Sequence, residues 1–108
     1  MSPISLPETA AALPEAWRSL VVGEVGPARV KVLRMDELPV AEESHPVAEA
    51  LLVLDGRLEL AVRGRPVPVR PGELYLVPAA TPHTVLPGSR GTLVIVELQD
   101  DPGSGPAD

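Results

Sequence analysis

Turn-forming residues divide this chain into short segments, and that punctuation constrains the fold more than any other feature. The 108 residues include 14 prolines and nine glycines, which recur between apolar runs rich in valine and leucine. Hydrophobic residues nevertheless make up 44% of the chain, well above what a disordered chain carries. The pattern predicts a compact, turn-rich β domain.

Two of the clearest expected strands flank Asp55-Gly56. Residues 50–54 form a continuous apolar run, and residues 57–63 alternate between apolar and polar side chains. Asp-Gly between two such runs is a strong hairpin signal, so we expect a turn there. Other segments read as strands are residues 19–25, 29–32, 66–70, 74–77, 83–86 and 92–98. About eight short strands at regular spacing indicate a sandwich or small barrel, not a βαβ fold.

The length allows one domain with a real core but no second domain. We expect an N-terminal arm over residues 1–20, a β domain over residues 21–99 and a disordered tail over residues 100–108. Within the arm, residues 14–20 have the composition of a short helical turn, and Trp17 is expected to pack the arm on the body.

Charge and hydropathy exclude several classes of partner. The formal net charge is −6 and the basic residues are scattered, so we expect no nucleic-acid binding. No apolar run reaches the length of a membrane span, and the N-terminus has no signal-peptide pattern, so we expect a cytoplasmic protein without a membrane partner. The chain has no cysteine, so any metal would be held by histidine or carboxylate side chains.

Some expected strands are apolar on both faces, whereas one is half polar. Residues 51–54 and 93–96 need cover on both sides, and a small domain often obtains it from a second copy. We therefore expect a homodimer, with the N-terminal arm as the alternative cover. In contrast, residues 29–32 alternate arginine and lysine with valine, the pattern of a half-buried strand.

The two histidines of the chain, His45 and His83, both lie beside prolines at the ends of expected strands. With Glu49 they would supply two imidazoles and one carboxylate, a ligand set that suits a divalent transition metal and leaves positions open. In an unbroken strand the Cα atoms of His45 and Glu49 would lie roughly 13 Å apart, at about 3.3 Å per residue. The chain must therefore bend between them, and Pro46 is a plausible place.

Each of these residues also has a simpler interpretation. His83 fits a hydrogen-bonded core or loop histidine, because buried neutral histidine is common. Glu49 opens an apolar strand, where an unpaired carboxylate would be costly. A metal, an arginine partner or a bend into solvent would each relieve that cost.

Two stretches of the chain resemble the motifs of the cupin superfamily, which are small jelly-roll barrels. Residues 49–56 match the glutamate-to-glycine half of the first motif. Residues 72–83 match the second motif in its glycine, proline and histidine, with Ala80 where the family has glycine and Pro87 where it has asparagine. The resemblance covers roughly residues 30–98. It implies an all-β, single-domain jelly-roll β-barrel with a short N-terminal arm.

The resemblance leaves the register of the first motif open. With a spacing of three residues to Glu49, His45 takes the second histidine position and Glu43 the first. With a spacing of four the pair becomes Glu42 and Ser44, and His45 drops out. We favour the first register because it uses both histidines of the chain. The metal ligands implied by this register are Glu43, His45, Glu49 and His83.

The family resemblance implies a fold more strongly than an activity, because cupins include dioxygenases, isomerases, decarboxylases, storage proteins and ligand-binding domains. We expect the barrel to bind a divalent transition metal, Fe, Mn, Ni or Zn, and a small-molecule ligand or substrate. If the protein is an enzyme, the metal would act on a small polar substrate. The alternative is a metal-free barrel that binds a small aliphatic ligand or serves a structural role.

Overall fold

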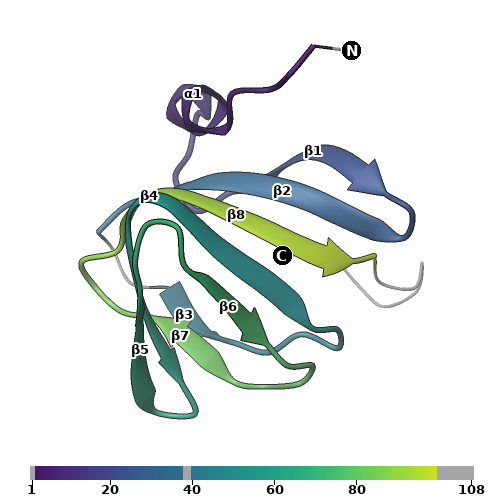
Figure 1. Cartoon of the computed structure of the whole chain (residues 1–108). Coiled ribbons are helices and arrows are strands. Elements are labelled where there is room, and N and C mark those ends of the chain that lie inside the picture. The colour runs from purple at the N-terminus through teal and green to yellow at the C-terminus, as the bar shows by residue number, and fades with distance from the viewer. Residues whose placement is uncertain (1, 38–39, 100–108) are drawn as a thin grey trace.

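The computed structural model describes residues 2–37 and 40–99. These ranges contain one short helix and eight strands, and every strand pairing is antiparallel (Figure 1). The elements are α1 (Leu6–Ala12), β1 (Leu20–Val25), β2 (Ala28–Met35), β3 (Val40–Glu43), β4 (Glu49–Val62), β5 (Arg65–Val69), β6 (Leu74–Val77), β7 (His83–Val85) and β8 (Arg90–Leu98). The predicted all-β jelly-roll barrel is confirmed, while the predicted tail at residues 100–108 lies outside the described residues.

The strands curl into two sheets that share β4. The first sheet has the order β1-β2-β8-β4-β6, and the second has the order β5-β4-β7-β3. Figure 1 shows the two sheets facing each other around the barrel interior, with α1 beyond β2. The proline-containing β5 pairs only with β4 among the described strands, which is the edge position that its prolines predicted.

The hairpin predicted at Asp55-Gly56 is wrong, because β4 runs through these residues from one sheet into the other. The pairing of β4 with β8 shifts register between Val53 and Asp55, and Gly56 has a φ of 76°. A Cβ atom on Gly56 would collide with the carbonyl oxygen of Arg90 on β8. The Asp-Gly pair thus forms a bulge where the backbones of β4 and β8 approach closely. Such a bulge needs glycine because of its positive φ, as a tight turn does.

The helix of the N-terminal arm lies earlier than the sequence predicted, at residues 6–12 and not within residues 14–20. Ser5 is its N-cap, with a side-chain oxygen that accepts a hydrogen bond from the backbone N–H of Glu8 at 3.4 Å. The helix packs against β2 and β8. This helix is far too short to cross a membrane, and no other helix occurs in the described ranges.

Arg34 on β2 fastens the arm to the barrel. Its guanidinium donates hydrogen bonds to the carbonyl oxygens of Ala10 at 3.0 Å and Leu13 at 2.7 Å at the C-terminal end of the helix. Its own carbonyl oxygen accepts a hydrogen bond from the backbone N–H of Trp17 at 2.8 Å. The Trp17 side chain packs on the hydrophobic core, as the sequence predicted.

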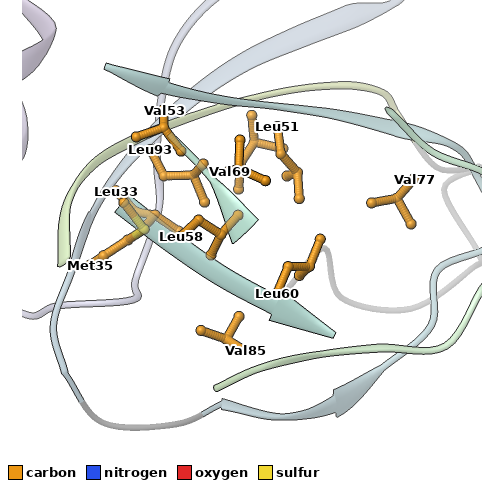
Figure 2. Close-up of a cluster of buried hydrophobic side chains, with 11 residues drawn as sticks. Leu33, Met35, Leu51, Val53, Leu58, Leu60, Val69, Val77, Val85 and Leu93 are labelled. Atoms are coloured by element: carbon orange, nitrogen blue, oxygen red, sulfur yellow. The ribbon is translucent and has the colours of Figure 1, made fainter. Parts of the chain in front are cut away.

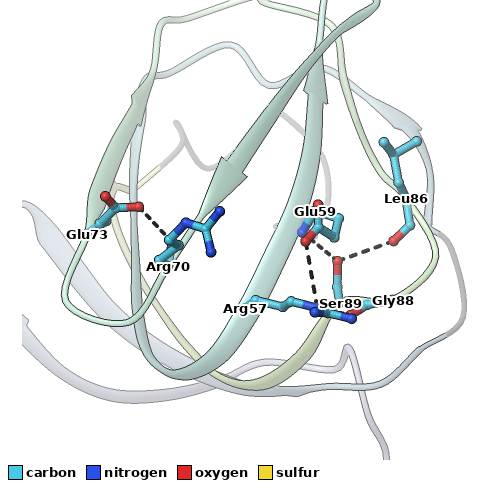
Figure 3. Close-up of polar contacts among 7 residues, drawn as sticks. All are labelled: Arg57, Glu59, Arg70, Glu73, Leu86, Gly88 and Ser89. Carbon is cyan, nitrogen blue, oxygen red and sulfur yellow. Dashed lines mark hydrogen bonds and ion pairs between the residues drawn. The ribbon is translucent and has the colours of Figure 1, made fainter.

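The loop between β7 and β8 is held against β4 by polar contacts (Figure 3). The buried hydroxyl of Ser89 accepts a hydrogen bond from the N–H of Glu59 at 2.8 Å and donates one to the carbonyl of Leu86 at 3.2 Å. Arg57 donates to the carbonyl of Gly88 at 3.1 Å. These bonds fix the end of the barrel away from both histidines.

The hydrophobic core fills one part of the barrel interior (Figure 2). Its members are Leu33, Met35, Leu51, Val53, Leu58, Leu60, Val69, Val77, Val85, Leu93 and Ile95. Val53 and Leu58 are wholly inaccessible to solvent. Burying a side chain of this size stabilises a fold by roughly 1.5–3 kcal/mol, so this cluster is the main source of stability.

Candidate metal centre

Three strands bring the sequence-predicted site residues to the barrel interior. Glu43 ends β3, Glu49 opens β4 and His83 opens β7, while His45 follows β3 in the connection to β4. Glu43 and His83 are paired across the β3–β7 ladder, so their side chains share a face. The chain bends between His45 and Glu49, where the sequence required it.

Glu43, His45 and His83 form a compact group of ligands. One ligand atom from each lies within 4.8 Å of the other two. The two imidazole rings are 5.8 Å apart between centroids. Glu43 and His45 belong to this group, whereas Glu42 and Ser44 are exposed.

The loop of the second motif also positions His45, which belongs to the first motif. The backbone N–H of Ala80 donates a hydrogen bond to the carbonyl oxygen of His45 at 2.7 Å. Ala80 has a φ of 57°, in the left-handed region that favours glycine. This strained turn therefore places His45 beside His83.

The protonation of the His83 ring follows from its neighbours. Its Nδ1 lies 2.9 Å from the carbonyl oxygen of Thr81, which can only accept, so Nδ1 carries a hydrogen. In the neutral ring Nε2 therefore has a lone pair. That nitrogen lies 3.4 Å from Oε1 of Glu49, and both side chains are buried. A lone pair facing a carboxylate is unfavourable unless a proton or a metal ion lies between them.

The pKa directions of the two groups express this pairing. The hydrogen bond to Glu49 raises the pKa of His83; burial opposes the rise, and the bond to Thr81 and the charges of Glu49 and Glu43 add to it. Burial alone would raise the pKa of Glu49. The hydrogen bond to His83, the charges of His45 and His83, and a hydrogen bond to Glu97 outweigh burial and lower it. Both shifts favour the state in which His83 is protonated and Glu49 is ionised.

Glu49 lies beside the group of three ligands and connects it to a second buried cluster. Glu49 and Glu97 are directly opposite on β4 and β8, an arrangement that is destabilising for like charges. Lys31 compensates, because its Nζ lies 2.6 Å from Oε1 of Glu97. Arg29 contacts the same oxygen at 3.3 Å.

The sequence analysis did not identify Lys31, Glu97 and Arg29 as a charged cluster next to the site. A strand was correctly predicted at residues 29–32, but its expected half-buried pattern is wrong, because Lys31, Val32 and Leu33 are all buried. The polar Lys31 faces the barrel interior, with only 2% of its surface exposed. A signal was present, because Lys31 shares its parity with Leu33 and Met35, and Glu97 shares its parity with Leu93 and Ile95. Parity identifies side chains on one face of a strand, but not which face is buried.

The cavity beneath these residues is small and mostly apolar. Its volume is about 120 Å³. Its lining includes the side chains of Lys31, Glu43, His45, Glu49 and His83, and apolar residues such as Trp17, Leu51 and Leu93. The cavity is therefore polar toward the histidines and apolar beyond them.

Comparison with known proteins agrees with this architecture. A sequence model described as the cupin domain matches residues 34–98, more than half of the chain. The chain belongs to the cupin family. No curated protein matches this cupin at a significant level.

Solved structures resemble this cupin in fold. A cupin-2 domain protein from Shewanella frigidimarina superposes with a TM-score of 0.80 at 21% identity, covering 89% of this chain and 94% of its own. Protein NMB1881 from Neisseria meningitidis gives 0.77 at 19%, covering 91% and 100%. A putative mannose-6-phosphate isomerase from Ralstonia eutropha gives 0.68 at 18%, covering 82% and 89%. At these identities the likeness establishes the fold alone.

The residues present fit a metal ion of the kind that cupins bind. Two imidazoles and a carboxylate with ligand atoms within 4.8 Å of one another form the donor set that suits divalent transition metals. The Thr81 carbonyl fixes the His83 tautomer so that Nε2 is the donor atom, a common outer contact of metal-bound histidine.

Proposed function

We propose that this cupin binds one divalent transition metal through Glu43, His45 and His83, with Glu49 as a further ligand. The observation that carries the proposal is the group of Glu43, His45 and His83, whose ligand atoms lie within 4.8 Å of one another, with Oε1 of Glu49 3.4 Å from Nε2 of His83. A divalent cation between these atoms would satisfy both. The donor set suits Fe, Mn, Ni or Zn.

The metal would supply Lewis-acid chemistry to a bound small polar molecule. The protein's own residues have supporting roles. Thr81 holds the His83 ring in one orientation, and Ala80 holds the backbone of His45. The lining is apolar at the far end of the cavity, and an apolar environment strengthens electrostatic interactions near the ligands.

Elemental analysis tests the metal proposal. The protein would be purified without a chelating column, dialysed against mixed trace metals and analysed beside Glu43→Gln and His83→Ala. We expect near one equivalent of a transition metal in the wild type and its loss in both variants.

Glu42→Gln is the matched control, because Glu42 is adjacent in sequence but exposed. It should retain the metal. Absence of metal from the wild type, or equal metal in Glu43→Gln and Glu42→Gln, would rule out this ligand set.

A second candidate function, a metal-free barrel that binds a small aliphatic ligand, is favoured by the same contacts in another protonation state. A doubly protonated His83 would donate to both Thr81 and Glu49, which satisfies these buried groups without a metal. Metal-free wild type with an intact fold, stabilised by small aliphatic ligands, would select this function.

We also propose that the protein forms a homodimer through the outer face of the first sheet. Val30, Val96, Ala50 and Leu76 form a continuous apolar row across β2, β8, β4 and β6. Leu76 is 64% exposed and Val96 is 38% exposed. The helix α1 packs on β2 and β8 but leaves these residues uncovered, so the arm covers only part of the face.

A second copy is the partner that suits this row. The chain has a net charge of −6, so two copies repel each other through most surfaces. The row carries no charge and lets identical faces meet without that repulsion. Sedimentation velocity should show a wild-type dimer and a monomeric Leu76→Glu variant.

Leu86→Glu is the control, because Leu86 is an exposed leucine outside the first sheet. It should remain dimeric. A monomeric wild type, or a dimer that survives Leu76→Glu, would disprove this interface.

A further inference from the structure

Lys31 occupies an unusual position for a lysine, because it lines the cavity with its side chain only 3% exposed. A buried ammonium is costly unless it is paired, and Glu97 is its partner at 2.6 Å. An ammonium group has three N–H donors, so Lys31 can hold Glu97 and contact a molecule in the cavity at the same time.

The charges around the cavity favour an anion once a metal is bound, so this inference rests on the proposed metal site. Glu43, Glu49 and Lys31 line the cavity, and Glu97 next to it pairs with both Lys31 and Arg29, so the group has three carboxylates and two fixed cations. A divalent ion bound by neutral histidines would leave one positive charge in excess. A single carboxylate on a ligand would balance it, whereas a neutral or cationic ligand would not.

The size and lining of the cavity limit the rest of the ligand. A cavity of about 120 Å³ is slightly smaller than the roughly 150 Å³ that holds a benzene molecule in another protein. Beyond Lys31 the lining is apolar and includes Leu33 of β2, Leu51 of β4 and Leu93 of β8. The ligand therefore has at most about six non-hydrogen atoms, with one charged end and one aliphatic end.

The geometry points to a short-chain monocarboxylate as the ligand of this cavity, with its carboxylate bound by the Lys31 ammonium beside the metal and its aliphatic part among the leucines. Lys31 is a specificity residue in this assignment, because it contacts the ligand and not the metal.

Titration calorimetry with butyrate and with butanamide, its uncharged analogue of nearly the same shape, tests this assignment on metal-loaded protein. The variant is Lys31→Met/Glu97→Gln, which removes both charges of the pair and leaves Arg29 beside an amide oxygen that can still accept its hydrogen bond. Its control is Arg57→Met/Glu59→Gln, the corresponding removal of both charges from another ion pair, which is drawn in Figure 3. Metal content is measured for all of them.

In the wild type and the control we expect butyrate to bind roughly 10- to 100-fold more tightly than butanamide, the range of a hydrogen bond to a charged group. The Lys31→Met/Glu97→Gln variant should lose at least ten-fold of that preference while retaining its metal.

Equal binding of butyrate and butanamide to metal-loaded wild type would overturn the assignment of a carboxylate ligand but not the metal proposal. A preference for butyrate that persists in Lys31→Met/Glu97→Gln would also overturn it, because the metal would then be the only carboxylate receptor. A wild type that takes up no metal would overturn both the metal proposal and this one.

Discussion

The two ends of the barrel interior are built by the same strands but behave oppositely. At one end, Val53 and Leu58 are wholly buried among other aliphatic side chains. At the other, Lys31, Glu49 and Glu97 are almost as deeply buried but carry charge. Removing aliphatic side chains from water stabilises the fold, whereas burying charges stabilises it little or not at all. The comparison teaches that the charged end adds little stability by itself and depends on complete pairing of its charges.

The largest expected effect concerns the apolar end. Leu58→Ala should lower the free energy of unfolding by about 4 kcal/mol, because it removes buried methyl groups and leaves a cavity. Urea denaturation measures this loss. Metal content per folded molecule should not change. A loss below about 1 kcal/mol would show that the core is loosely packed around this residue.

Lys31→Met should have the next largest effect, about 3 kcal/mol of destabilisation, because it leaves Glu97 without its partner at 2.6 Å. Arg29 still contacts Glu97, which limits the cost. Lys31→Met/Glu97→Gln should recover most of the lost stability in the same urea experiment. A double variant less stable than Lys31→Met would show that the pair is itself a net source of stability.

The pH dependence of the metal-free protein should reflect the Glu49–His83 pair. The pKa of His83 is raised above its ordinary value of 6.5, so its contribution is complete below pH 6.5 and is lost as pH rises through the raised value. The pKa of Glu49 is lowered below 4.5, so its contribution is complete above pH 4.5 and is lost as pH falls through the lowered value.

The urea midpoint in the presence of a chelator should therefore be highest between about pH 4.5 and pH 6.5. His83→Gln should flatten the decline on the alkaline side. A wild-type midpoint that increases steadily from pH 6.5 to pH 8 would contradict the assigned pair.

The smallest expected effect is a gain. Ala80→Gly should stabilise the protein by about 0.5–1 kcal/mol, because it relieves a φ of 57° in the turn that positions His45. The gain is limited because glycine also increases the entropy of the unfolded chain. Ala79→Gly, at a neighbouring residue without a positive φ, should not stabilise. Thermal denaturation of both variants distinguishes strain relief from a general effect of glycine.

Much of the fold could be predicted from the sequence, because turn-forming prolines and glycines and the alternation of polar and apolar residues are local signals. The Asp55-Gly56 pair was misread because a bulge and a hairpin both need glycine at positive φ, and the difference depends on where Arg90 passes. Of the candidate site, the two motifs predicted Glu43, His45, Glu49 and His83, and the fold brings these four side chains to one cavity. The Lys31–Glu97 pair was missed because it joins residues far apart in sequence through a pairing that only the folded sheet reveals.

The passage of β4 through both sheets has a consequence for how the molecule opens. Residues 49–53 pair within the first sheet and residues 58–62 within the second, without a flexible joint between them. Neither sheet can therefore separate from the other without breaking the backbone hydrogen bonds of the same strand. Amide hydrogens along the whole of β4 should exchange together at the rate of global unfolding, while those of the N-terminal helix exchange earlier.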